Sequence, residues 1–522
     1  MAASVGENRG VGKVTLLFGV LFGFGLNAAM ADISSRIEQD LLKFHQNPAS
    51  FMNDPKYVEK VDARTGQVIK PRTSLSIQQR QKEDFVAYRE QVRLNLQQSR
   101  AVRGEPITGR SAIAPHDRPE DLVDSFEVST LKEIEDRGLM SSRLDQSPWS
   151  GDYWEIVSGQ IAKRYADERF PESPDWKINR DYLLRTHMSS SVDQLSPAEK
   201  YDLLVGDADL SLTKSNVNEG QAYYNAIGSV ESWMGICHGW APASYMEDRP
   251  THAVSAMAAD NHTRITFYPS DIKALASLLW ANASPQVRFV GGRCDQKNAK
   301  FGEDGRIIDQ ECYDTNPATW HLSVVNQIGI SKRSFIMDAS YDYEVWNQPI
   351  LGYKYTYFNP KTSKAVERLD EALVPLNDFE KDVFHKYRTN PDAVSVVGIS
   401  AEITYVGENF PTIDLLDSSK DDIWGSVNYL YDLELDRNGK IVGGEWYHNM
   451  HPDFLWTPPP GSQAKTAADR LLDRLDAPSE WDNLKDVSMP ELWKKLAVKN
   501  SRAHLPLMHI VKALIKNSNL NF

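Results

Sequence analysis

The spacing of hydrophobic and polar residues changes along this chain. Apolar residues recur at helical spacing over Ile33–Leu42, and Leu75–Leu96 continues as a polar, helix-prone stretch. Beyond about residue 260 the period shortens to that of strands, and residues 462–522 return to a helical pattern. The pattern predicts helical segments at both ends of a body that mixes helices and strands, which is an α+β fold.

Most predicted strands lie in the second half of the chain. Trp320–Gly329 and Arg333–Asp338 are predicted to pair as an antiparallel hairpin. Single strands are expected at Arg264–Tyr268, Tyr353–Tyr357, Ser395–Tyr405, Ser426–Leu435 and Lys440–Tyr447.

Two local signals predict helix starts in the first half. Ser196 and Glu199 have the spacing of a capping box, with Pro197 at the first helical position. Ala241–Met246, shortly after Cys237, is predicted to be a short buried helix.

Composition shifts divide the chain into a leader (1–31), a helical N-terminal segment (32–145), a main body (146–460) and a C-terminal helical segment (461–522). Arg100–Pro119 has the composition of a linker. The N-terminal segment is interpreted either as a removable regulatory part or as a helical lobe packed on the core.

The first 31 residues have the pattern of a secretory signal peptide. Arg9 and Lys13 precede an apolar run over Val14–Leu26, and Ala29-Met30-Ala31 is a cleavage site of the A-x-A type. The apolar run is too short to span a bilayer, and no later segment is long enough. We expect cleavage after Ala31 and a secreted or periplasmic protein; the alternative is an uncleaved N-terminal anchor.

Composition excludes several classes of partner. Asp and Glu number 72 against 58 Lys and Arg, a net charge of −14, so nucleic acid and anionic membranes are not expected partners. The 13 Trp and 21 Tyr argue against disorder. They favour a packed interior or a substrate groove lined with rings.

The chain has three cysteines, and export makes their pairing informative. Cys294 and Cys312 flank a short polar segment and are predicted to form a disulfide worth about 3 kcal/mol. Cys237 then remains as a free thiol, although pairing of Cys237 with either of the others is an alternative.

Cys237 is the candidate nucleophile. At the start of a helix, a thiol faces unpaired backbone N–H groups and the positive end of the helix dipole, which favour its thiolate. The same N–H groups can bind an oxyanion. The alternative is a buried structural cysteine.

His321 and Asp338 are the predicted base and orienting residue. If both lie on adjacent antiparallel strands, Asp338 can accept a hydrogen bond from the His321 ring while the other nitrogen faces Cys237. Alternatively, His321 is a core histidine. The alternative bases are His448, His451 and His238, although His238, on the same helix turn, would point away from Cys237. The alternative orienting residues are Asn326 and Asp342.

The spacing of four residues is similar to that of a calcium-binding loop: Glu434, Asp436, Asn438 and Glu445. Both flanks have strand patterns, and Asn438-Gly439 is a strong hairpin signal, so a hairpin is preferred. No cofactor is required by this interpretation, and calcium remains the alternative.

Several stretches resemble the transglutaminase elicitor family, the oomycete-type transglutaminases and their homologues. Gly235-Ile236-Cys237, followed by His and Asp on later strands, resembles transglutaminases in general. The run Val345-Trp346-Asn347-Gln348-Pro349 is similar to the surface peptide of the elicitor family, although Ile350, Leu351 and Tyr353 depart from that peptide. Similarity also covers Pro148–Trp154, Gly444–Trp446 and His451–Trp456.

The resemblance implies a papain-like core and protein-glutamine γ-glutamyltransferase activity. Cys237 would form a thioester with a glutamine side chain of a protein substrate, and a primary amine such as lysine would accept the acyl group. The indole of Trp233 or Trp240 would assist the backbone N–H of Cys237 in holding the oxyanion. The alternatives are a cysteine peptidase, a glutamine deamidase, or a catalytically silent surface protein recognised through Val345–Pro349.

Overall fold

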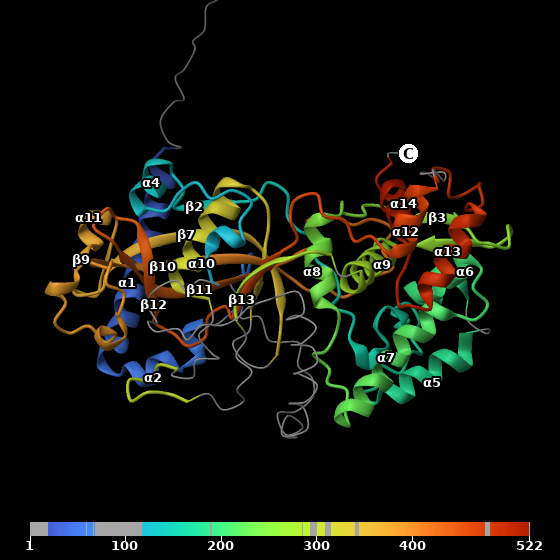
Figure 1. Ribbon diagram of the computed structural model, residues 1–522, viewed down its shortest axis with the longest axis horizontal. Helices are drawn as coiled ribbons and strands as arrows, with labels where there is room; N and C mark the ends of the chain where they lie inside the picture. Colours follow the sequence, from blue (N-terminus) through green and yellow to red (C-terminus); the bar gives the residue numbers. More distant parts are fainter. Residues whose placement is uncertain are drawn as a thin grey trace, which may run out of the picture.

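The computed structural model describes residues 19–58, 60–65, 67, 117–187, 191–283, 285–292, 300–307, 315–339, 344–475 and 481–520. Two halves lie side by side, a half rich in strands and a half built of helices, with helix α8 between them (Figure 1). The predicted helix at Leu75–Leu96 and the predicted Cys294–Cys312 disulfide lie outside the described residues.

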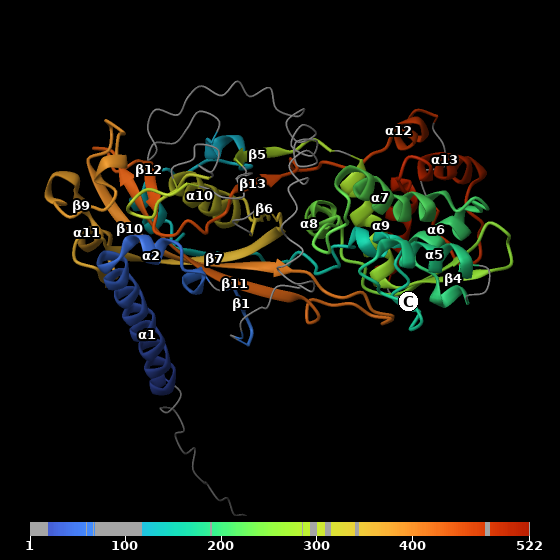
Figure 2. The ribbon, with the colours of Figure 1, turned by 90° about the horizontal axis from the view of Figure 1, so that it is seen from below.

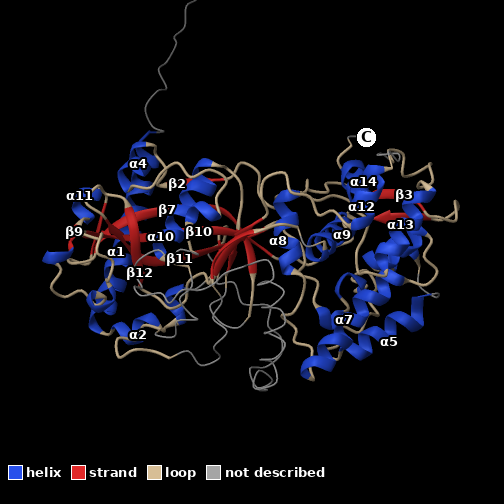
Figure 3. Ribbon diagram, in the orientation of Figure 1, coloured by secondary structure: helices blue, strands red, loops and turns tan. Residues whose placement is uncertain are grey.

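The first half is organised around an antiparallel sheet (Figure 3). Its strands follow the order β1-β11-β10-β7-β6-β13-β5, while β2 and β8 pair with β7, β9 with β10 and β12 with β11. The bounds are β1 (Val61–Asp62), β2 (Ser141–Arg143), β5 (Arg288–Gly291), β6 (Ile336–Asp338), β7 (Asn347–Asn359), β8 (Lys364–Val366), β9 (Val374–Pro375), β10 (Ser395–Gly407), β11 (Ile423–Leu435), β12 (Ile441–Trp446) and β13 (Phe454–Thr457). The expected mixture of helix and antiparallel sheet is confirmed.

Strand β7 is the centre of this sheet. One edge pairs with β10 from Ile350 to Phe358, and the other edge pairs in succession with β6, β2 and β8. At its first residue, Asn347 lies opposite Asp338 of β6. Almost all of its side chains are buried, because neighbouring strands and helices enclose it. The first residues of β7 are therefore held in a fixed position.

The second half is helical. It contains α5 (Trp176–Thr186), α6 (Pro197–Val205), α7 (Ser211–Ile227), α8 (Cys237–Met246), α9 (Pro269–Asn282), α12 (Ala467–Arg474), α13 (Glu491–Ser501) and α14 (Met508–Ser518), with the hairpin β3 (Val254–Met257) and β4 (Arg264–Phe267). The predicted capping box at the start of α6 is confirmed: the Ser196 hydroxyl accepts from Glu199 N–H, and Pro197 is the first helical residue.

The N-terminal segment packs on the sheet half. Helix α1 (Gly19–Gln46) projects from this half with its C-terminal end beside α2 (Pro48–Met52) (Figure 2). Its residues Ile37, Leu41 and Phe44 are buried in a cluster that includes Tyr447. Farther on, β1 pairs with β11, and Lys60 Nζ donates to the Ala339 carbonyl. In the part of the chain that the structure describes, no helix combines the length and apolar character needed to cross a membrane.

The predicted strand at Trp320–Gly329 is wrong, because this segment is helical. Helix α10 (Pro317–Val324) continues as a π-helical turn, η9 (Val325–Ile330). Asn316 caps the helix by accepting from Ala318 N–H, and Pro317 is its first residue, a combination that favours a helix start. Strand β6 pairs with β7 and β13 instead.

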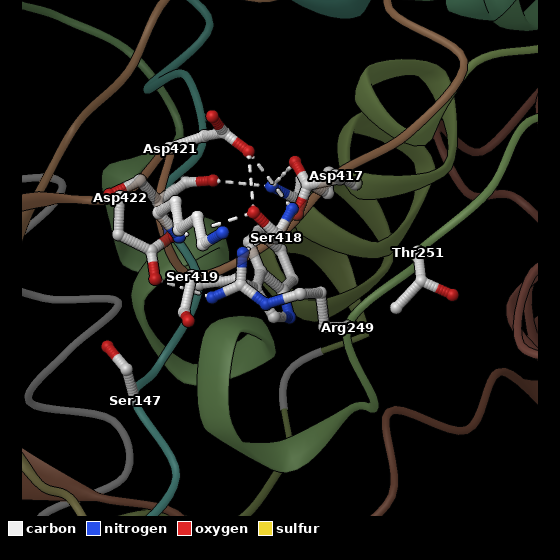
Figure 4. A network of polar contacts seen from close by, with 12 residues as sticks. Ser147, Arg249, Thr251, Asp417, Ser418, Ser419, Asp421 and Asp422 are labelled. Atoms are coloured by element: carbon white, nitrogen blue, oxygen red, sulfur yellow. Dashed lines mark hydrogen bonds and ion pairs between the residues drawn. The ribbon is translucent and has the colours of Figure 1, made fainter.

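A network of charges fastens the long connection between β10 and β11 to the helical half (Figure 4). Arg249 forms ion pairs with Asp417 and Asp422, and Asp417 N–H donates to the Thr251 carbonyl. Lys273 of α9 contacts Asp417 at 2.6 Å. Because these groups come from both halves, the network joins the β10–β11 connection to α9 and to the residues that follow α8.

Candidate active site

Cys237 is the first residue of α8, which begins four residues before the helix predicted at Ala241–Met246 and, as expected, places the thiol at a helix N-terminus. The chain enters the helix through a tight contact in which Ile236 N–H donates to the Tyr153 carbonyl at 2.7 Å. Gly235 permits this approach, because a Cβ there would overlap the same carbonyl oxygen. The N–H groups of the first helical residues, Cys237 and His238, have no acceptor within the helix and are available to an oxyanion.

Neither predicted indole donor is directed at the thiol. Trp240 is fully buried and its Nε1 donates to the Trp149 carbonyl at 3.2 Å. Trp233 Nε1 donates to the carboxylate of Glu231. Each indole N–H thus has an acceptor of its own. The assignment of these two side chains to the oxyanion therefore finds no support in the geometry.

The thiol contacts the segment that starts β7. Cys237 Sγ lies 3.4 Å from Nδ2 of Asn347, and the thiol donates to the Val345 carbonyl over 3.6 Å. Asn347 is in turn held by Trp456 of β13, whose Nε1 donates to Asn347 Oδ1 at 2.7 Å. Asn347 and Trp456 lie in stretches that resemble the elicitor family, but no local sequence pattern indicates that they meet at the thiol.

Asp338 also lies at this site. It ends β6, is fully buried and is paired across the sheet with Asn347. Its Oδ1 accepts from the backbone N–H of Trp346 at 3.0 Å, which fixes the turn that presents the Val345 carbonyl to the thiol. Of the predicted triad, the structure therefore brings Cys237 and Asp338 to the same site.

A second carboxylate near the thiol was not predicted. Glu408 follows the last residue of β10 and accepts from Nε2 of Gln348 at 2.8 Å. Glu408 is half-buried, and it follows Gly407 at the β10–β11 turn, a position without a sequence signal for chemistry.

Burial raises the pKa of the Cys237 thiol to about 11. Hydrogen bonds from the side chain and backbone of Asn347 lower this pKa, whereas the negative charges of Glu408 and Asp338 raise it. In this arrangement the thiol is neutral at physiological pH. Formation of a thiolate therefore depends on hydrogen-bond donors and on proton transfer during the reaction.

The structure does not bring His321 to Cys237, and this part of the prediction is corrected. His321 lies on α10, where its Nδ1 contacts Tyr431 Oη at 2.9 Å and its ring packs against Tyr355. Tyr355 is eight residues along β7 from Asn347, which corresponds to about 26 Å of extended strand. Burial lowers the pKa of His321 to about 3, so the ring is neutral. His321 is a core histidine here.

The alternative bases and orienting residues lie in several different surroundings. His238 is exposed on α8 beside Cys237. His448 stacks on Phe51 and His451 on Trp446. The Asn326 side chain accepts from the backbone N–H groups of residues 127 and 128. Asp342 lies outside the described residues.

The run Val345–Pro349, the elicitor-like run, is mostly internal. Val345 and Trp346 are half-buried, and Asn347, Gln348 and Pro349 are buried within β7. The expectation of a surface peptide is therefore wrong for this fold. In the folded chain the segment forms one wall of the site, and the Trp346 ring packs edge-on against Tyr153 at 5.3 Å.

The calcium candidates do not form a calcium loop. Glu434 pairs with Arg388 and Glu445 with Arg306, so arginines already neutralise both carboxylates. Asp436 and Asn438-Gly439 form the predicted hairpin turn between β11 and β12. Across the described ranges, no group of three or more His, Cys, Asp or Glu side chains is arranged to hold a metal ion.

No curated protein matches the chain. The crystal structure of the GP42 transglutaminase from Phytophthora sojae matches with 24% identity and a TM-score of 0.45, covering 65% of this chain and 88% of that chain. Residues 121–473 match the family described as Transglutaminase elicitor, which spans more than half of the chain and every contact described above for Cys237. The chain belongs to the transglutaminase elicitor family.

Proposed function

We propose that this protein is an exported protein-glutamine γ-glutamyltransferase in which Cys237 is the nucleophile. The observation that carries the proposal is the buried thiol at the first residue of α8, held between the Asn347 amide and the Val345 carbonyl. Membership of the transglutaminase elicitor family supports acyl transfer as the reaction class. The substrates would be proteins that carry glutamine, with lysine side chains or other primary amines as acceptors.

The reaction proceeds through a thioester. Cys237 Sγ attacks the glutamine carboxamide carbon, the C–N bond breaks, and ammonia leaves with the thiol proton. A primary amine then attacks the thioester carbon, the C–S bond breaks, and a proton of the amine returns to sulfur. The backbone N–H of Cys237 stabilises the oxyanion in both steps. The Trp346 and Tyr153 rings limit access of water, which favours the amine over hydrolysis.

Asp338 takes part in proton transfer in this proposal, and His321 does not. The Asp338 carboxylate is buried beside the site and its charge acts on the Cys237 thiol. His321 packs against Tyr355, too far along β7 to exchange a proton with the sulfur. Asp338 also fixes the Val345–Trp346 turn through the Trp346 N–H.

Export rests on the leader pattern of residues 1–31 and remains a proposal, as does the Cys294–Cys312 disulfide. Expression with the leader should give a chain that begins at Asp32, as read by N-terminal sequencing. Peptide mapping without reduction should link Cys294 to Cys312 and leave Cys237 free to react with a thiol reagent. A disulfide that includes Cys237 would contradict the proposed resting enzyme.

The activity is tested by incubating the protein with a glutamine-bearing protein and a labelled primary amine. The wild type should incorporate the amine and release ammonia, and Cys237→Ala should do neither. Ammonia release without incorporation would instead identify a deamidase, and cleavage of the chain a peptidase. Equal incorporation by wild type and Cys237→Ala would refute the nucleophile.

A further inference from the structure

We propose that Asn347 is a further catalytic residue, whose side-chain amide stabilises the thiolate of Cys237. The proposal rests on Cys237 being the nucleophile of the function proposed above. It concerns a residue of the elicitor-like run, and it gives that run a role in the chemistry of the folded protein.

The hydrogen bonds fix which end of the amide faces the sulfur. An indole N–H can only donate, so Trp456 Nε1, at 2.7 Å, requires the oxygen of the Asn347 amide as its acceptor. The amide nitrogen therefore faces Cys237 Sγ, at 3.4 Å. A rotation of the amide by 180° would place an N–H against the indole N–H and a carbonyl oxygen against the sulfur. Trp456 thus makes Asn347 a donor to sulfur.

Packing prevents the amide from moving away. Asn347 is 3% exposed and begins β7, where the backbone is paired with Asp338 of β6. Trp456 belongs to β13, the next strand beyond β6. The donor is therefore positioned by three consecutive strands before any substrate binds, and its alignment costs no reorganisation during the reaction.

The local charges make such a donor necessary. Asp338 and Glu408 both place negative charge near the sulfur, and burial removes the water that would otherwise solvate a thiolate. A hydrogen bond to a charged sulfur is stronger than one to a neutral thiol. Asn347 therefore favours the thiolate over the thiol, in opposition to the two carboxylates.

The test measures the kinetic pKa of Cys237, from the pH dependence of its alkylation by iodoacetamide, followed by mass spectrometry of the peptide that contains Cys237. In Asn347→Ala the pKa should rise by about one to two units. Trp456→Phe keeps the ring but removes the indole donor, and should raise the pKa by a smaller amount. Asn428→Ala is the matched control, because Asn428 is a strand asparagine of β11 that contacts Ser400, remote from the site. It should leave the pKa unchanged.

An unchanged pKa in Asn347→Ala would overturn the proposal. If that variant fails to fold, as judged by circular dichroism, an unchanged pKa in Trp456→Phe would overturn it equally. Alkylation requires neither glutamine nor amine, so the result is independent of whether the protein transfers acyl groups. A protein without transferase activity, but with the predicted pKa changes, would refute the proposed function and leave the role of Asn347 at the sulfur intact.

Discussion

The two side chains that the sequence suggested as partners, Cys237 and His321, contact strand β7 at different places, and their surroundings differ. At the first end of β7, Cys237 meets an amide, a backbone carbonyl and the charge of two carboxylates. Toward the other end, His321 meets tyrosines: a hydroxyl of Tyr431 and the ring of Tyr355. Both residues are buried and both lie on helices that pack near the same strand.

This difference shows what a perturbed pKa can and cannot indicate. Burial alone accounts for the low pKa of His321, whereas the pKa of Cys237 is set by burial, hydrogen bonds and neighbouring charges acting in opposite directions. Perturbed groups mark functional sites when specific charged or hydrogen-bonding partners surround them. The thiol end of β7 meets this condition, and the His321 end does not.

The largest expected effect is on kcat/KM, and it distinguishes Asp338, beside the thiol, from His321, farther along β7. Asp338→Asn should lower kcat/KM for amine incorporation by about a hundredfold or more, because a group that transfers protons is lost. The same change should lower the kinetic pKa of the thiol, since a negative charge is removed. His321→Gln should leave kcat/KM per folded molecule within a few-fold of wild type. The contrast fails if His321→Gln loses activity as severely as Asp338→Asn, at equal folded fraction in circular dichroism.

The next effect concerns the network that joins the halves. Arg249→Met leaves Asp422, which is almost fully buried, without its cationic partner and should cost about 3 kcal/mol of unfolding free energy in urea titrations. Hydrogen exchange should increase in α8 and in the β10–β11 connection, and remain unchanged in α10. Arg368→Met removes only an exposed ion pair with Asp370 and should cost little. Similar losses of unfolding free energy in the two variants would show that the network does not stabilise the contact between the two halves.

A smaller effect is expected from pH at the His321 end. The folded pKa of about 3 lies below the ordinary value of 6.5, so between these values the unfolded chain binds a proton that the folded chain does not. His321 therefore supports stability above about pH 6.5, and this contribution is lost as the pH falls toward 3, at about 1.4 kcal/mol per pH unit. Urea titrations of His321→Gln from pH 7 to 4 should show a shallower pH dependence by that amount. An identical slope in wild type and variant would contradict the buried neutral ring.

The smallest effect tests the second carboxylate at the thiol end. Glu408→Gln removes a negative charge that raises the thiol pKa, so alkylation of Cys237 at neutral pH should accelerate a few-fold. Glu402→Gln, on an exposed position of the same strand β10, is the control and should not change the rate. Slower alkylation in Glu408→Gln would mean that the loss of its bond with Gln348 outweighs the charge.

Short-range signals made much of the fold predictable. The capping box at Ser196, the hairpin at Asn438-Gly439 and the helix that starts at Cys237 are each set by a few neighbouring residues. Strands β10 and β11 and the Tyr353–Tyr357 part of β7 were also predicted, because runs of β-branched and aromatic residues favour a pleated, buried surface.

The segment around His321 was wrongly predicted to be a strand, because its apolar residues fit both the helical and the strand period. Val324 and Val325 favour a strand, and the signal that favoured a helix, Asn316 followed by Pro317, was overlooked. The π-helical turn that follows is held by the Asn326 side chain, which bonds to backbone groups almost 200 residues earlier, at 127 and 128. No local pattern contains such a contact.

The sequence by itself determined the place of Cys237 at the start of a helix and the family, because these depend on contiguous residues. Only the tertiary structure decided which side chains surround the sulfur. Asn347 contacts Cys237 from β7, Trp456 of β13 orients Asn347, and the charge of Glu408 acts on the thiol. His321, equally suitable in chemistry, lies instead farther along β7, against Tyr355. Strand pairing and helix packing across the sheet set these distances, and they depend on the summed burial of many residues rather than on any single motif.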